Sequence, residues 1–234
     1  MVKNSSSSNN NLIVKNTAFL YFRMLFSMGI TLYTSRLILT ILGIDDFGIY
    51  NVIGGMVSMF LFLNTAMSSA TSRFLTFEIG KREKSEISKV FSVSLTTHLI
   101  IIAIIFVLCE SIGVWFLNSK MIIPEDRVYA ANIVLQTSIA ASLINIIQVP
   151  YRAIVVSYEK MDMYAYIEIF NVVSKLLIAI ALIYTTCDKL ITYSYLYLVT
   201  CIVVFLIYAV YANFRCVGAN FSPKLDNCLL YTSP

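Results

Sequence analysis

Long apolar runs alternate with short polar segments along most of this sequence, and the pattern predicts a bundle of membrane-spanning helices. The runs are long enough for helices, because a helix needs ~20 residues to cross a hydrocarbon core of about 30 Å. A strand of a membrane barrel would be about half as long and would alternate apolar with polar residues. The expected fold class is therefore all-α, a polytopic membrane protein built as a six-transmembrane-helix bundle.

Turn and loop signals place the ends of the expected helices. Gly43, followed by Asp45 and Asp46, ends the first helix, and the segment 73–89 is too charged to lie in lipid. Pro150 is expected to kink or end the fourth helix, because proline removes an intrahelical hydrogen bond. The six expected helices cover about residues 16–42, 47–72, 90–117, 128–156, 163–187 and 192–214. The short connections leave no room for a folded domain outside the membrane.

Composition and charge support this interpretation. With 59% hydrophobic and 13% charged residues and a mean hydropathy of +0.80, the chain does not fit a soluble domain. The net charge of +4 implies no nucleic-acid partner. If the amino terminus is cytoplasmic, eleven cations fall inside, namely Lys3, Lys15, Arg73, Lys81, Arg82, Lys84, Lys89, Arg152, Lys160, Arg215 and Lys224, and three outside, namely Lys120, Arg127 and Lys189. Basic residues gather on the cytoplasmic side, so both termini are expected there.

Some ionisable residues fall within the expected spans, where a charge costs about 3 kcal/mol on insertion scales. They are Arg23, Arg36, Glu110, Glu168 and Lys175, with His98 as a weaker candidate. Arg23 and Lys175 are expected to line a cavity. For Arg36 and Glu110, near helix ends, a buried ion pair or a snorkelling side chain is an equally good explanation. A satisfied packing role suits His98 better than a proton relay.

Small and polar residues mark the second expected helix, including Gly54, Gly55 and Ser58. They suggest close helix contacts, which is the default interpretation, or a hydrated wall. Asn145 and Gln148 add hydrogen-bonding groups at membrane depth.

The sequence contains no Walker loop, metal-ligand cluster or nucleophile triad, and its five cysteines include no C-x-x-C pair. Structural packing is therefore the expected role of the cysteines. No catalytic residue, metal site or cofactor is expected, and the protein is not expected to be an enzyme.

Four segments resemble a known family. They are NTAFLYFRMLFSMGITLYTSRLILTILGIDDFGIYNVIGG, SATSRFLTFEIGK, IPEDRVYAANIVLQ and VPYRAIVVSYEKMDMYAYIEI. Together they resemble the amino-terminal half of bacterial polysaccharide (O-antigen and lipopolysaccharide) flippases of the multidrug/oligosaccharidyl-lipid/polysaccharide exporter superfamily. The likeness covers roughly residues 12–215, and the stretch 36–55 is its most specific part.

The resemblance implies a transporter in the bacterial inner membrane that moves undecaprenyl-diphosphate-linked oligosaccharide between leaflets through a cationic cavity. Arg23, Arg36 and Lys175 are the substrate-binding residues that it implies, with Arg73 at the cytoplasmic mouth. Guanidinium and ammonium groups suit a diphosphate, which offers negative charge and many acceptor oxygens.

The family has two lobes, whereas this chain resembles only one, so a second lobe is expected in the full-length protein. The expected organisation is a disordered cytoplasmic tail at 1–11, a transmembrane lobe at 12–215 and a tail at 216–234. That tail departs from the family and looks like a truncation artefact.

Two other functions stay open. A cation-coupled multidrug exporter of the same fold would call for deep carboxylates, and a non-transporting assembly partner would need no cavity. The short loops argue against a membrane polymerase or glycosyltransferase.

Overall fold

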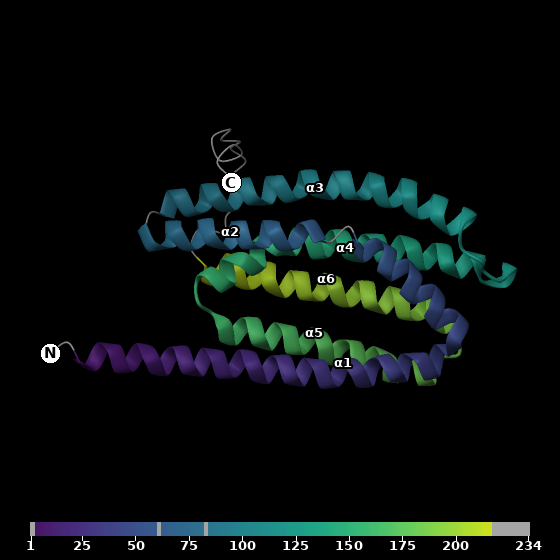
Figure 1. The fold of residues 1–234 in the computed structure, drawn as a ribbon, viewed down its shortest axis with the longest axis horizontal. Coiled ribbons are helices and arrows are strands. Elements are labelled where there is room, and N and C mark those ends of the chain that lie inside the picture. The colour runs from purple at the N-terminus through teal and green to yellow at the C-terminus, as the bar shows by residue number, and fades with distance from the viewer. Residues whose placement is uncertain (1–2, 60–61, 82–83, 217–234) are drawn as a thin grey trace.

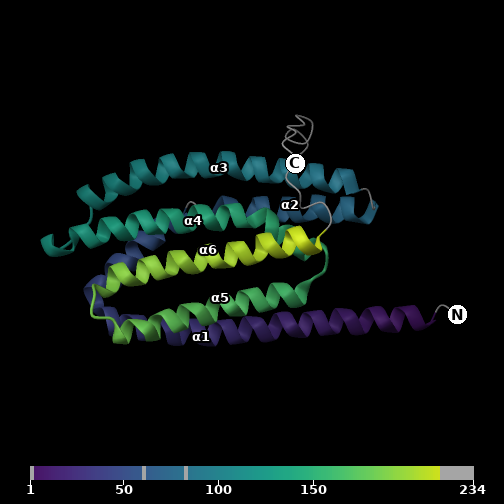
Figure 2. The ribbon, with the colours of Figure 1, turned by 180° about the vertical axis from the view of Figure 1, so that it is seen from behind.

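The computed structural model describes residues 3–59, 62–81 and 84–216, and every regular element in these ranges is helical. The α-helices are α1 (Lys3–Met59), α2 (Phe62–Lys81), α3 (Lys84–Ser119), α4 (Val128–Ser157), α5 (Met161–Ala181) and α6 (Lys189–Arg215), and two short 3-10 helices are η1 (Glu125–Arg127) and η2 (Leu182–Tyr184). The helices lie lengthwise in one elongated bundle (Figures 1 and 2). The all-α fold class is confirmed for this part of the chain.

Five stretches of the described residues are long and apolar enough to cross a membrane. They are Leu20–Met59, Ile87–Ser119, Glu125–Ser157, Met161–Tyr184 and Lys189–Arg215. The expected count of six spans is therefore not confirmed, because α2 is not among these stretches.

α1 reverses direction at Gly43, as its glycine and the following aspartates predict. Gly43 has φ 82° and ψ 176°, a conformation that only glycine adopts without strain. It divides α1 into a first arm (residues 3–42) and a return arm (residues 44–59). Figure 1 shows the return arm turning back along the bundle toward α2.

The second expected helix, about 47–72, corresponds to the return arm and the first part of α2, and residues 60–61 lie outside the described ranges. The return arm ends at Met59 and α2 begins at Phe62. The segment 73–89, expected as a polar connection, is also mostly helical, because α2 continues to Lys81 and α3 begins at Lys84. Charged residues are unsuited to lipid, but they are stable on helical turns that lie outside it. Neighbouring charges can pair there, as Lys81 Nζ and Glu78 Oε1 do at 3.1 Å.

Pro150 does not end α4, which continues past it to Ser157. That part of the prediction was wrong. Proline is tolerated inside membrane helices where neighbouring groups compensate the lost backbone hydrogen bond.

The expected division at 1–11, 12–215 and 216–234 stays a prediction. α1 begins at Lys3 and so includes most of the segment 1–11. The tail expected from residue 216 lies outside the described residues, except for Cys216 itself.

α4 is the central helix of the bundle. Sixteen of its thirty residues are buried, and it packs against α6, α2, α3 and α1. The core is two main apolar clusters along α4, one around Phe91, Ile154 and Tyr208 and another around Ile53 and Leu135. These clusters hold α2, α3, α6 and the return arm around α4.

The first arm of α1 packs on α5, away from α3 (Figure 1). Arg23 lies on Tyr164 near the start of α5, and Ile38 packs with Ile178 and Ala179 near its end. The two helices therefore run parallel and in fixed register.

The ends of the bundle differ in what they contain. We call the end with the α2–α3 and α4–α5 connections and the end of α6 the first end, and the other end the second (Figure 1). At the second end, Arg127 pairs with Asp46, 3.3 Å away, and with Asp188. Asp188 also caps α6 by accepting hydrogen bonds from the backbone N–H groups of Leu190 and Ile191. One guanidinium thus joins the Gly43 turn, η1 and the start of α6.

Candidate transport site

A pocket of about 310 Å³ lies between the return arm, α4 and α6. Small, hydroxyl, amide and tyrosine residues line it, and none of them is charged. The lining is Tyr50, Asn51, Gly54, Gly55, Val57, Ser58, Ser138, Ala141, Ser142, Asn145 and Tyr197. We call this the polar pocket. Since all three helices belong to apolar spans, it offers uncharged polar groups within the predicted membrane region.

Gly54 and Gly55 keep the pocket open rather than allowing close helix contact. A Cβ placed on either glycine would meet no atom of a neighbouring helix or side chain within 4 Å. By contrast, a Cβ on Gly113 would lie 3.2 Å from both Leu135 Cδ1 and Met56 Cε. Of the two interpretations of the small residues, the hydrated wall fits Gly54 and Gly55 better than packing does.

Three tyrosines form one side of the site. The rings of Tyr50 and Tyr193 meet edge to face with centroids 5.0 Å apart, and those of Tyr193 and Tyr197 stack at 6.5 Å. Tyr50 and Tyr197 also line the pocket. These tyrosines were not predicted from the sequence, although the four-residue spacing of Tyr193 and Tyr197 places both on one face of α6.

Lys175 of α5 lies beside this tyrosine group. Its Nζ is 5.1 Å from the centroid of the Tyr197 ring, a cation–π distance, and it also lies near Cys201. Cys201 is within hydrogen-bonding reach of Tyr197 and Asn145, which both line the pocket. Lys175 therefore places a positive charge next to the pocket wall, and no ion pair joins it to a carboxylate of the described residues.

Arg23 lies at a different level of the bundle. Its guanidinium carbon is 4.8 Å from the centroid of the Tyr164 ring, and its buried Nε has no hydrogen-bond partner among the described residues. Tyr164 and Lys175 are eleven residues apart on α5, or about 16 Å along the helix. The structure does not bring Arg23 and Lys175 into one cluster.

The other two expected cations are exposed. Arg36 lies on the first arm of α1, two residues from buried Thr34 on one side and from buried Ile38 on the other. Its side chain therefore points away from the face that packs on α5. Arg73 is exposed on α2. Neither Arg36 nor Arg73 lines the polar pocket, and neither lies beside Arg23 or Lys175.

The remaining ionisable residues are paired within the bundle. Gln136 Nε2 donates to Glu110 Oε2 at 3.1 Å, and the Tyr208 hydroxyl donates to Glu168 Oε1 at 3.4 Å. His98 is fully buried, with Nδ1 2.7 Å from the Ser94 carbonyl oxygen, while its Nε2 has no partner among the described residues. His98 is therefore satisfied at one ring nitrogen only, and its expected packing role stays a prediction.

Within the described ranges no group of three or more histidine, cysteine or acidic residues is arranged to hold a metal ion. Cys109, Cys201 and Cys216 are buried and Cys187 is exposed, all as free thiols. Cys228 lies outside the described residues.

Comparisons with known proteins place the chain in a family. The MatE family profile matches residues 19–181, more than half of the sequence. The fold is similar to that of a solved protein entitled "Outward-facing conformation of a multidrug resistance MATE family transporter of the MOP superfamily", with a TM-score of 0.71 and 18% identity over 89% of this chain. The chain spans 47% of the length of that protein. No curated protein sequence matches it significantly. This sequence, a multi-pass membrane bundle with the fold of MATE transporters, belongs to the MatE family.

Proposed function

We propose that the chain forms one lobe of a membrane exporter of the multidrug type, and that the polar pocket is the part of the lobe that binds substrate. The MatE match and the similarity to a transporter entitled a multidrug resistance protein both support this proposal. They favour the multidrug exporter, the alternative in the sequence analysis, over a flippase of lipid-linked oligosaccharide. The chain spans 47% of that transporter, so the activity is proposed for an assembly with a second lobe.

The observation that carries the proposal is the uncharged polar lining of the pocket, which lacks the deep carboxylates expected of a cation-coupled exporter, so no coupling ion is part of the proposal. Its volume of about 310 Å³ falls at the lower end of the range for small-molecule sites, roughly 300–1,000 Å³. Hydroxyl and amide groups at membrane depth can exchange hydrogen bonds with a ligand, and tyrosine rings can stack on its apolar part. This combination suits a small amphiphilic molecule better than a large glycan.

The test compares two serines that differ only in position. Ser58 lines the pocket and donates to the Gly55 carbonyl oxygen, whereas Ser111 is exposed on α3 and donates to the Val107 carbonyl oxygen. Because the activity is proposed for an assembly with a second lobe, the chain is expressed together with that lobe in bacteria that lack their main exporters, and efflux of a neutral amphiphilic dye is measured. We expect Ser58→Leu to fill the pocket and abolish efflux, while Ser111→Leu keeps it. Equal efflux from both variants, or none from the unmodified protein, would refute the proposal.

A flippase remains the second candidate because of Lys175 and Arg23. Both are cations in apolar spans without a carboxylate partner among the described residues, which suits an anionic diphosphate. In a flippase-null strain, Lys175→Ala or Arg23→Ala should then insert normally but fail to restore surface polysaccharide. Lys120→Ala is the control, because Lys120 makes a similar contact, 5.8 Å from the Trp115 ring centroid, outside the apolar spans. Full complementation by both variants would remove the flippase hypothesis.

A further inference from the structure

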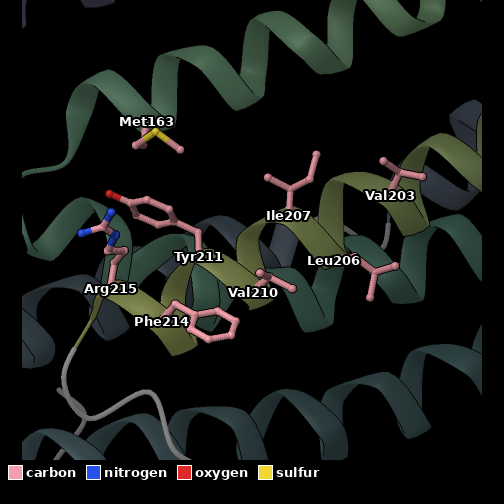
Figure 3. A pocket seen from close by; sticks show the side chains of 8 residues that line it. All are labelled: Met163, Val203, Leu206, Ile207, Val210, Tyr211, Phe214 and Arg215. Carbon is pink, nitrogen blue, oxygen red and sulfur yellow. The ribbon is translucent and has the colours of Figure 1, made fainter.

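A second hollow of the lobe is apolar and lies between α5 and α6 at the first end of the bundle. It has a volume of about 470 Å³ and is lined by Met163 of α5 and by a stripe of α6 residues (Figure 3). The α6 stripe is Val203, Leu206, Ile207, Val210, Tyr211, Phe214 and Arg215. We call this the α5–α6 groove. It shares no lining residue with the polar pocket.

The groove has the length of one leaflet. From Val203 to Arg215 α6 rises ~18 Å, at about 1.5 Å per residue. Half of a ~30 Å hydrocarbon core is about 15 Å. The apolar stripe therefore begins near the middle of the membrane and ends at its surface. Leu206 and Val210 leave about half of their surface uncovered by the described part of the lobe, at 51% and 53%.

The surface end of the groove is polar and includes a basic residue. Figure 3 shows the Arg215 guanidinium and the Tyr211 hydroxyl together at this end, with the aliphatic side chains extending away from them. Lys160 lies near the end of α6, where it interacts with Cys216. The acidic Asp162 is also close to Tyr211, and Glu159 precedes Lys160, but Arg215 is the charged residue that lines the groove itself.

We propose that the α5–α6 groove binds an anionic phospholipid, with one acyl chain along α6 and the phosphate on Arg215. Basic pockets between membrane helices on the cytoplasmic side are a recurrent way to bind anionic headgroups. The positive-inside distribution predicts that the first end, with Arg215 and Lys160, is cytoplasmic. A tyrosine at the headgroup level fits the aromatic belt at membrane interfaces. This proposal does not depend on the substrate of the exporter.

The test uses the full chain in detergent, with native mass spectrometry of bound phosphatidylglycerol and phosphatidylcholine of equal chain length. We expect preferential binding of phosphatidylglycerol. Arg215→Gln should lower that preference about fivefold, the effect of one basic residue near a headgroup. Lys189→Gln, at the opposite end of α6, is the matched control and should leave the preference unchanged. Equal loss in both variants would overturn the proposal, because it would mean that only overall charge matters.

A second variant tests the apolar part separately. Val210→Trp fills the groove at an exposed position and should remove binding of both lipids. Soluble glycerol phosphate should not compete, since the acyl chain supplies the affinity. Competition by glycerol phosphate would show a free-phosphate site instead. If Val210→Trp kept lipid binding but blocked assembly with a second lobe, the groove would be a protein interface and the proposal would fail.

Discussion

The Arg127 contacts at the second end offer the sharpest test of how the lobe is held together. Arg127 bridges Asp46, whose side chain is 8% exposed, and Asp188, whose side chain is 32% exposed. Replacing Arg127 with alanine leaves Asp46 buried without a cation. Asp46 Oδ1 already has no hydrogen-bond partner among the described residues. The variant therefore leaves a nearly buried carboxylate with no compensation.

The size of the effect follows from these exposures. Leaving a buried polar group without its partner costs about 1–3 kcal/mol, whereas an exposed ion pair contributes about 0–1 kcal/mol. The first range applies to the Asp46 contact, because that carboxylate is nearly buried. The Asp188 contact is more exposed and lies nearer the second range. We expect Arg127→Ala to lower the free energy of unfolding by about 2 kcal/mol. For a chain of this length that corresponds to a fall in Tm of about 4–8 °C.

The assay is thermal unfolding in detergent, with Lys120→Ala in the same connection as the control. Lys120 contacts the Trp115 ring rather than a carboxylate, so its loss should shift Tm much less. A double-mutant cycle with Asp46→Asn should give a coupling energy of about 1 kcal/mol or more. Equal shifts for Arg127→Ala and Lys120→Ala, or additive effects in the cycle, would refute the reasoning.

Two further outcomes are expected. Gly43→Ala should destabilise the protein by about 1–3 kcal/mol in chemical unfolding, because the added Cβ has open space but the backbone conformation is strained for alanine. Gly48→Ala, whose Cβ also has open space but whose backbone is helical, should be neutral or slightly stabilising. Equal effects of the two variants would contradict this reasoning. In single-cysteine variants, a membrane-impermeant maleimide on whole cells should label Cys187 but not Cys216, and labelling of Cys216 from outside would reverse the predicted orientation. In opened membranes at pH 8, the reaction of Cys216 with the maleimide should still be slow, and its rate should increase as the pH rises. Burial raises the thiol pKa of Cys216 to about 11, so about one thiol in a thousand is the reactive thiolate at pH 8.

Much of the fold followed from local sequence signals. The apolar runs predict long helices because only helices satisfy every backbone group within hydrocarbon. The reversal at Gly43 was predictable as well, because the positive φ there favours glycine. The course of α4 beyond Pro150 was not, because packing decides whether neighbouring groups compensate the hydrogen bond that proline removes.

The candidate site depended more on tertiary structure. The sequence identified Lys175 and Arg23 as costly charges, but both could equally have met carboxylates on other helices. Tyr197 and Tyr164 are their partners in the structure because α5 packs between the first arm of α1 and α6. Arg36 has the same sequence signal as Arg23 and ends up exposed on the other side of α1.

The sequence by itself determined that this chain is a helical membrane bundle, and where its charges are unusual. Only the tertiary structure decided which small residues surround open space and which meet a neighbouring helix. Gly54 and Gly113 look alike in sequence, yet one borders the polar pocket, whereas a Cβ on the other would crowd Leu135. The physical reason is that helix periodicity fixes the face a residue occupies, while helix packing fixes what that face meets.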